Sequence, residues 1–407
     1  MKFLLCTLFV VCDKNIRKSI EFVIITFMER FLLKNCAVVL PNEKLERAFV
    51  LIENGLIANI SASELSAAEI IDLEGQTLFA GFIDIHNHGA VGVDVNEANA
   101  EDLQSVGKFL AKNGVTAWLP TLVPDSDKTY QTVIGAIEQV IKIQNNLPLA
   151  QIVGVHYEGV FANAQMCGAL RPAYFKTFSG TELNSLPRLA EGAHLTTFAP
   201  EIEGGIELVK ELRKQNWIPS IGHTKGDFAT LEKAFEAGAM HVTHLFNAMT
   251  GVHHREVGVA GWALTKDEIS CEIIADGIHV APRMLAFAQK NKPSDKLLLV
   301  SDSVAPTGLG DGQFQLWGEQ ISVKNGRTQN ERGSIAGSVI TLLEAVKMYL
   351  SLGVSESQVS KMASANPAKL LGLENSQGTI EIGKRADLVA LDEQGNVRLT
   401  IIGGQVI

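Results

Sequence analysis

The sequence predicts an α/β protein: a (β/α)8 barrel with a small β-sandwich domain formed by both chain ends. Short apolar runs alternate with amphipathic stretches over most of the chain, as expected for a barrel of about 250 residues. Both flanks show strand-like alternation instead. No G-x-G-x-x-G follows the first apolar run, which disfavours a doubly wound open sheet.

Residues 1–27 differ from the rest of the chain. Their apolar run, 3–11, is shorter than the roughly 20 residues that a membrane span needs. No small-x-small cleavage site follows it, so it is a poor match to a signal peptide. We expect translation to begin at Met28, so that residues 1–27 result from the choice of start codon, and the protein to be cytoplasmic. A membrane anchor in residues 1–27 is the less favoured alternative.

The predicted second domain comes from residues 28–77 and 376–407. Turn signals at 41–42 and 54–55 divide the first segment, and one at 393–396 divides the second. Neither segment can bury a core alone, so we expect the two to pair into one small β-sandwich.

Residues 78–375 are the predicted barrel. Eight apolar runs supply its strands: 77–88, 115–121, 151–159, 194–201, 217–224, 240–247, 271–279 and 296–303. The sequences between them have a helical period, for example at 206–216 and 228–239.

Composition limits the class of partner. The chain has 46% hydrophobic and 20% charged residues, which excludes a disordered protein. The net charge of −10 gives no overall attraction to nucleic acid or to anionic membranes. Five cysteines without C-x-x-C spacing indicate free thiols in a reducing compartment.

Side chains that bind metals stand at the ends of the predicted strands, where barrel active sites lie. The expected ligands of zinc or iron are His86, His88, Glu158, His223 and His244. His86 and His88 are two residues apart on a strand, so both rings should point to one face. We expect three other histidines to be hydrogen-bonded core residues: His156, His194 and His241.

Three further residues have a functional and a structural interpretation. Asp302 is either the general base for an activated water or a cap for the following turn. His279 either polarises a carbonyl oxygen or makes a supporting hydrogen bond. Arg255 either binds a phosphate, helped by backbone N–H groups at 247–248, or pairs with Glu256.

These motifs resemble the N-acetylglucosamine-6-phosphate deacetylases of the metal-dependent amidohydrolase superfamily. The matching segments, in order, are GFIDIHNHGAVGVD, VHYEG, GHT, THLFNAMTG, HHRE, IADGIHV, LVSDSVAPTG, GSIAGS and GTIEIGKRADLV. The resemblance runs from about Met28 to the C-terminus. The THLFNAM, HHRE and ADGIH segments together are specific to this family, whereas H-x-H alone marks only the superfamily.

The resemblance implies that the enzyme removes acetate from a phosphorylated N-acetyl amino sugar and works as a homodimer. It implies a divalent metal at Glu158, His223 and His244, and a second ion where His86 and His88 are present. Asp302 matches the catalytic acid/base, and His279 the residue that contacts the amide carbonyl. Substrate contacts are implied for Ala169, Asn247, Ala248, Arg255, His279, Ile335, Ala336 and Gly337.

Three features depart from the family pattern. Val160 stands where proline is usual, residues 165–167 lack the lysines that usually precede Gly168 and Ala169, and Leu170 stands where a substrate-contacting histidine is common. The HHRE and LWGE segments also resemble the N-acetylgalactosamine-6-phosphate branch, so the sugar epimer stays open. A cyclic-amide hydrolase of the dihydroorotase type is a less favoured alternative, because residues 194–201 lack the lysine that such enzymes carry after the fourth strand. A non-catalytic sugar-phosphate binding protein is the other alternative.

Overall fold

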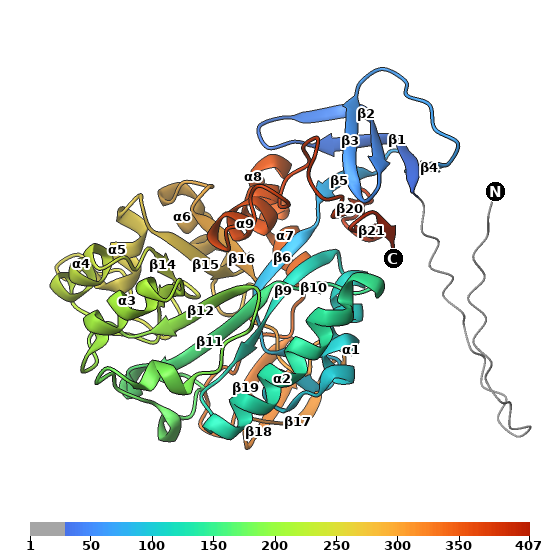
Figure 1. Cartoon of the computed structure of the whole chain (residues 1–407). Helices are drawn as coiled ribbons and strands as arrows, with labels where there is room; N and C mark the ends of the chain where they lie inside the picture. The colour runs from blue at the N-terminus through green and yellow to red at the C-terminus, as the bar shows by residue number, and fades with distance from the viewer. Residues whose placement is uncertain (1–28) are drawn as a thin grey trace, which may run out of the picture.

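Parallel strands follow one another round a nearly closed sheet in chain order (Figure 1). The computed structural model describes residues 29–407, so the expectations for residues 1–27 lie outside it. The barrel strands are β6 (Phe82–Asn87), β9 (Val115–Leu122), β10 (Gln151–Ile152) continued by β11 (Gly154–Phe161), β12 (Ala193–Phe198), β13 (Ile218–Ile221), β14 (His241–Val242), β15 (Ser270–Ile274) and β16 (Leu297–Val300). Each predicted strand is present, which confirms the barrel.

Backbone hydrogen bonds join the end of β6 to the residues just after β16 and so bring the two edges of the sheet together. The N–H of Asp302 donates to the carbonyl of His86 at 2.9 Å, and the N–H of His88 donates to that of Ser303 at 2.8 Å. The place where the sheet closes therefore contains His86 and His88, two candidate metal ligands, and Asp302, the candidate general base.

Helices cover the outside of the barrel. Those between strands are α1 (Ala100–Lys112), α2 (Asp127–Ile143), α3 (Gly205–Lys214), α4 (Phe228–Glu236), α5 (Gly258–Thr265) and α6 (Pro282–Asn291). The chain between β11 and β12 forms only short 3-10 turns. After the barrel come α7 (Leu342–Ser351), α8 (Glu356–Ser360) and α9 (Asn366–Leu370). No helix within residues 29–407 is long and apolar enough to cross a membrane.

Helix α1 illustrates how the sequence sets these elements. Asn99 caps its first turn: its side chain accepts from the N–H of Asp102, and the Asp102 carboxylate accepts from the N–H of Asn99. A cap of this kind stabilises a helix by about 1 kcal/mol. Leu103, Val106 and Leu110 recur at helical spacing and are buried, so this face packs on the barrel.

Both chain ends form one separate sheet, as predicted (Figure 1). Its strands are β1 (Arg30–Val39), β2 (Lys44–Glu53), β3 (Leu56–Ser61), β4 (Ile70–Asp72), β5 (Thr77–Ala80), β20 (Leu388–Leu391), β21 (Val397–Ile402) and β22 (Gln405–Val406). Antiparallel pairing of β5 with β20 joins the two ends, and the sheet has its own apolar core. Because β5 belongs to this sheet, the chain enters the barrel at Gly81 rather than directly after residue 77.

An antiparallel sheet that the sequence analysis did not foresee lies between β16 and α7. It consists of β17 (Gly312–Leu316), β18 (Glu319–Lys324) and β19 (Arg327–Asn330). The turn between β17 and β18 is Trp317-Gly318, and Trp317 is buried. The insert therefore brings a large aromatic side chain to the same region as the strand ends.

Candidate active site

A cavity of about 290 Å³ lies where the barrel strands end. It collects most of the residues that the sequence singles out. The lining residues are His88, Glu158, Gly168, Ala169, Leu170, His223, His244, Asn247, Ala248, His279, Asp302, Trp317, Ser334, Ile335 and Gly337.

Glu158, His223 and His244 bring three donor atoms to one point. Glu158 Oε1 lies 3.0 Å from His223 Nε2 and 3.0 Å from His244 Nε2, and the two ring nitrogens are 3.1 Å apart. All three side chains are almost fully buried. A buried carboxylate with two imidazoles is a common ligand set for zinc or iron.

The tautomer of His223 supports a cation at this point. Its Nδ1 lies 2.8 Å from the carbonyl oxygen of Met166. A carbonyl can only accept, so Nδ1 donates, and in the neutral ring Nε2 keeps its lone pair. That lone pair faces Glu158 Oε1, which is also an acceptor. A cation between the two atoms would remove their repulsion, so the residues fit a metal ion.

His86 and His88 converge as the sequence predicted, with their Nε2 atoms 3.2 Å apart. His88 Nε2 also lies 3.2 Å from Glu158 Oε2 and 3.2 Å from Asp302 Oδ1. His86 Nε2 is 3.5 Å from Glu158 Oε1. Glu158 therefore lies between two pairs of histidines. One pair is His223 and His244, and the other is His86 and His88.

The carboxylates and histidines of this cluster shift one another's pKa values. Burial lowers the pKa of His88, but Asp302 and Glu158 outweigh it and raise the pKa to about 9. The same carboxylates, with Glu272, hold the pKa of His86 well above its usual value despite burial. Burial raises the pKa of Asp302, yet His86 and His88 bring it below the ordinary value. Asp302 is therefore ionised and able to accept a proton.

Three of these residues adopt left-handed backbone conformations. The φ angles are 47° at His223, 30° at His244 and 51° at Asp302. Such angles are uncommon outside glycine and concentrate at functional sites. Each residue stands two positions after the end of a short strand, β13, β14 or β16, and each side chain lines the cavity.

His279 is held by a residue that the sequence analysis missed. Its Nδ1 lies 2.6 Å from Asp276 Oδ2, while the backbone N–H groups of Ile278 and His279 donate to Asp276 Oδ1. Asp276 stands three residues before His279, and this spacing was the available signal. The carboxylate fixes both the loop and the ring.

Glu272 is a second residue that the analysis missed. Its side chain is fully buried, and Oε2 lies 2.9 Å from His86 Nδ1 and accepts from the N–H of His244 at 3.2 Å. Oε1 lies 3.2 Å from His241 Nε2. The signal was a lone carboxylate inside the apolar strand SCEII. Carboxylates in this position orient metal-binding histidines.

The three histidines expected in the core are buried there. His156 Nε2 lies 2.8 Å from Thr197 Oγ1, and His194 Nε2 accepts from the N–H of Leu189 at 2.9 Å. His241 bonds Ser270 and Glu272.

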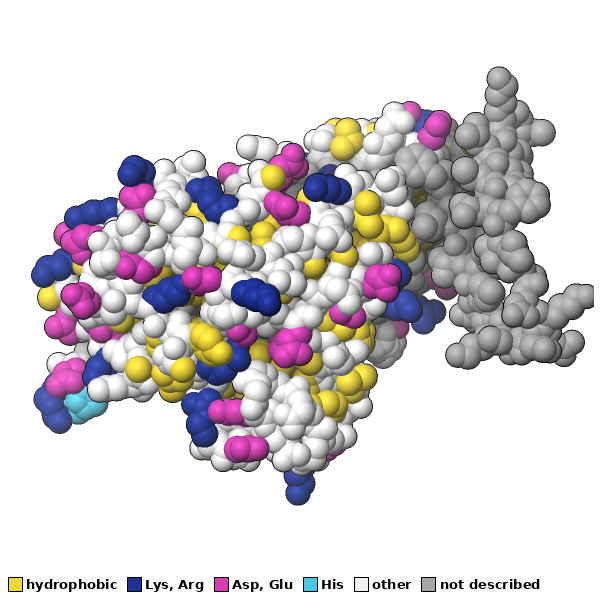
Figure 2. Space-filling model, turned by 60° about the horizontal axis from the view of Figure 1, so that its bottom comes forward, with side chains coloured by type: hydrophobic (Ala, Val, Ile, Leu, Met, Phe, Trp, Pro, Cys, Tyr) yellow, Lys and Arg dark blue, Asp and Glu magenta, His cyan; other side chains and the backbone are white. Residues whose placement is uncertain are grey.

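Two predicted substrate contacts do not line the cavity. Ala336 is fully buried in an apolar cluster that also contains Leu170 and Trp317. Arg255 lies on an exposed segment, and its Nη1 is 2.6 Å from His254 Nε2 rather than on Glu256. Figure 2 shows a face of the molecule on which basic and acidic side chains are interspersed.

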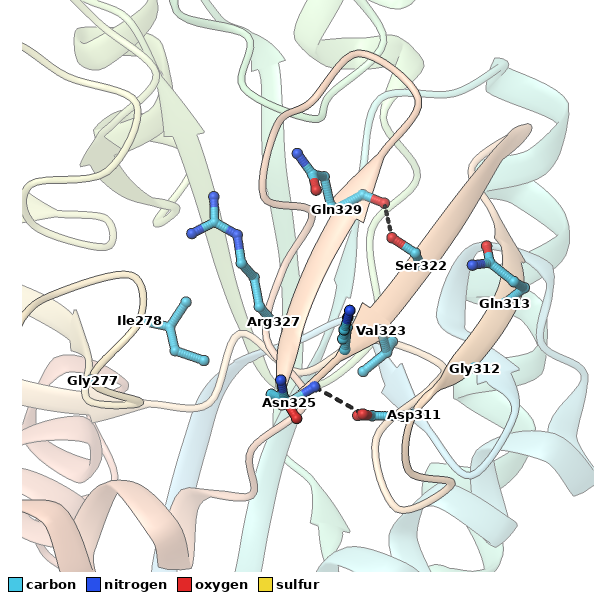
Figure 3. Close-up of a pocket in the computed structure, with 11 residues that line it drawn as sticks. Gly277, Ile278, Asp311, Gly312, Gln313, Ser322, Val323, Asn325, Arg327 and Gln329 are labelled. Carbon is cyan, nitrogen blue, oxygen red and sulfur yellow. Dashed lines mark hydrogen bonds between the residues drawn. The ribbon is translucent and has the colours of Figure 1, made fainter.

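A larger groove, of about 930 Å³, lies beside the β17–β19 sheet (Figure 3). Arg327 of β19 and Ile278 flank it, and the Asp311 carboxylate accepts from the N–H of Asn325. It contains no cluster of metal ligands, so the smaller cavity is the candidate active site.

Comparison with known proteins defines the class. The chain belongs to the amidohydrolase family, which it matches over residues 77–407. It is 34% identical to the N-acetylglucosamine-6-phosphate deacetylase of Bacillus subtilis over 385 residues, covering 93% of this chain and 97% of the relative. The N-acetylgalactosamine-6-phosphate deacetylase of Escherichia coli O157:H7 is 33% identical over 357 residues, 87% of this chain and 93% of the relative.

A solved structure agrees with these relatives. The N-acetylglucosamine-6-phosphate deacetylase of Thermotoga maritima has a TM-score of 0.83 and 33% identity, covering 92% of this chain and 99% of its own. The resemblance to these amino-sugar deacetylases is therefore confirmed. Gluco and galacto relatives are almost equally similar in sequence, so identity alone does not select the epimer.

Proposed function

We propose that the protein hydrolyses the acetamido group of N-acetyl-D-glucosamine 6-phosphate, giving D-glucosamine 6-phosphate and acetate. The observation that carries the proposal is the convergence of Glu158, His223 and His244 beside an ionised Asp302 in one buried cavity. The similarity to deacetylases over nearly the whole chain supports it.

Glu158, His223 and His244 would hold the divalent metal, zinc or iron, and His86 and His88 with Glu158 would hold a second ion where two bind. When bound, such a cation supplies a Lewis acid that polarises a carbonyl and lowers the pKa of water. The protein contributes fixed ligands: Glu272 orients His86, and Met166 orients His223.

Asp302 moves the proton in this mechanism. Its carboxylate is ionised, lies 3.2 Å from His88 through Oδ1 and lines the cavity. It accepts the proton of the water that attacks the amide carbonyl, and then returns it to the nitrogen of the leaving amine. Hydrolysis needs both transfers, and one carboxylate performs them in turn.

His279 contacts the amide carbonyl in the proposal. Because its Nδ1 donates to Asp276, Nε2 carries a proton only when the ring is an imidazolium. Polarisation of the carbonyl by His279 therefore requires the charged ring, paired with Asp276. The neutral ring would instead accept a hydrogen bond from a sugar hydroxyl.

Ala169, Asn247, Ala248, Ile335 and Gly337 line the cavity and are proposed sugar-phosphate contacts. Arg255 and Ala336 are also proposed to contact the sugar phosphate. In the single chain Arg255 lies outside the lining, so its contact with phosphate requires a shift of the exposed segment 251–257 or a second copy of the chain.

The galacto epimer is the second candidate substrate, supported by the 33% identity to a galacto deacetylase. A cyclic-amide hydrolase is less favoured, because Ala199, Pro200 and Glu201 follow β12 and none is a lysine. A purely binding role is less favoured because Glu158, His223, His244, His279 and Asp302 line one cavity, an arrangement that supports chemistry there.

The cytoplasmic location and the homodimer are also parts of the proposal. Among residues 29–407, Cys36, Cys167 and Cys271 are free thiols, which supports a reducing compartment. Light scattering of the purified protein would give twice the chain mass for a dimer; a single chain mass would contradict it.

The test is acetate release from three sugars by protein reconstituted with zinc or ferrous iron: N-acetylglucosamine 6-phosphate, its galacto epimer and unphosphorylated N-acetylglucosamine. Fast release from the gluco phosphate supports the main proposal, and a galacto preference transfers it to the second candidate. Arg255→Gln should raise KM for the phosphorylated sugar alone. Metal-loaded protein that releases no acetate from any of them would contradict a deacetylase.

A further inference from the structure

The cavity has one apolar wall, formed by Leu170 and Trp317. Both line the cavity, with exposed fractions of 3% and 7%. They belong to one apolar cluster that also contains Leu316 and Ala336. Two separate parts of the chain form the wall: Leu170 comes from the loop after β11, and Trp317 from the β17–β18 turn.

Trp317 occupies its place at a conformational cost. Its φ is 53° and that of Gly318 is 79°, so the two residues form a tight hairpin turn in the left-handed region. Glycine, asparagine or aspartate relaxes this conformation, whereas a bulky residue there is an outlier. A strained conformation of this kind in a cavity wall points to a function for the side chain.

The position of the wall relates it to the reaction centre. The Trp317 ring lies 5.2 Å from the His88 ring, nearly perpendicular to it at 76°. Leu170 covers Gly159, the neighbour of Glu158: a Cβ on Gly159 would lie 2.3 Å from Leu170 Cδ1. Both apolar side chains therefore border the residues that surround the scissile carbonyl.

The acyl chain of the proposed substrate suits such a wall. Sugar hydroxyls and phosphate oxygens need hydrogen-bond partners, and leaving them unpaired against the leucine side chain and the carbon face of the tryptophan ring carries a desolvation penalty. The carbon chain of the acyl group is apolar, and it is bonded directly to the carbonyl carbon. Polar partners for the sugar are available elsewhere in the lining, on Asn247 and Ser334.

We propose that Leu170 and Trp317 form the acyl pocket of the enzyme and set the length of the acyl group that it removes. The inference rests on the proposed deacetylase function and adds a specificity determinant to it. The substrate class is then a sugar phosphate with a short N-acyl chain, and the wall excludes longer chains.

The test compares kcat/KM for N-acetyl, N-propionyl and N-butyryl glucosamine 6-phosphate. One methylene in an apolar pocket changes kcat/KM by about 10- to 200-fold. Trp317→Ala should raise the butyryl-to-acetyl ratio at least tenfold, and Leu170→Ala should raise it as well. Neither should change the ratio between N-acetyl gluco and galacto phosphates. Trp317→Phe should give an intermediate acyl ratio and serves if the alanine variant does not fold.

Leu316→Ala is the matched control, because Leu316 lies in the same cluster and hairpin but does not line the cavity; its acyl ratio should equal that of wild type. An unchanged acyl ratio in the folded Trp317 and Leu170 variants would overturn the proposal, as would a shifted epimer ratio. If wild type hydrolyses none of these sugars, the proposed function fails. In that case the pocket is tested by equilibrium binding of the three acyl sugars to the same variants. The ratio of butyryl to acetyl affinity should then shift as described for kcat/KM.

Discussion

Replacing Glu272 with glutamine should weaken metal binding without disturbing the fold of the barrel. Glu272 does not line the active-site cavity; it acts through His86, whose Nδ1 lies 2.9 Å from Glu272 Oε2. The amide keeps the shape of the carboxylate and removes its charge. Its oxygen can still accept from His86 and from the N–H of His244, and its NH2 group can face His241 as that ring changes tautomer.

The magnitude follows from the role of such an orienting carboxylate. Loss of one typically costs 10- to 100-fold in metal affinity or activity, which is roughly 1.4–2.8 kcal/mol. We expect Glu272→Gln to lie in this range, because the hydrogen bonds survive and only the charge that makes His86 a stronger ligand is lost.

The assay is competition between the protein and a chelator of known affinity, with zinc as the metal. Asp387→Asn is the matched control: this carboxylate is also buried, accepts from Arg385 Nε at 2.9 Å and directly precedes β20 in the sheet that the two chain ends form. It should lower stability and leave zinc affinity unchanged. If Glu272→Gln binds zinc within twofold of wild type, the orienting role assigned to Glu272 is wrong.

Two further predictions concern stability. Burial and Arg188 lower the pKa of His194 to about 4, so below pH 6.5 the unfolded chain takes up a proton that the folded chain refuses. Stability is lost as pH falls from 6.5 to 4, and His194→Gln should reduce this slope by up to about 1.4 kcal/mol per pH unit in urea unfolding; equal slopes would refute it. Gly159→Ala places a Cβ against Leu170 and should lower both Tm and kcat/KM. Gly372→Ala, with a similar φ and open space, isolates the steric part, and equal losses in the two variants would contradict the clash.

The barrel could be predicted because buried parallel strands give continuous apolar runs. Polar residues that interrupt the apolar runs located two strand ends to within two residues, at His223 after β13 and at Asp302 after β16. Glu158, which the sequence also placed at a strand end, lies inside β11 instead. The β17–β19 insert was not predicted. Its strands, GQFQL and EQISVK, are short and partly exposed, so their pattern resembles that of a loop.

The site could be predicted in its residue types but not in its supporting contacts. His86 and His88 converge because residues two apart on a strand share a face. Glu272 and Asp276 act across the fold or around a turn, and no spacing rule links Glu272 to His86, 186 residues away. The left-handed angles at His223 and His244 arise where strands turn into loops, and sequence alone gives no signal for them. Arg255 has a side chain suited to binding phosphate, but the structure places it outside the cavity lining. The type of a residue therefore does not predict its position.

The central claim is that Asp302 transfers the proton in an amide hydrolysis at the end of the barrel. The most direct test measures acetate and free amine released from N-acetylglucosamine 6-phosphate by wild type and Asp302→Asn, with metal content and binding of the sugar measured on both. Wild type should release the two products in equal amounts. The variant should keep its metal and bind the sugar while kcat falls by about 10²- to 10⁴-fold, and Asp311→Asn should match wild type. Undiminished turnover by metal-loaded Asp302→Asn would contradict the account.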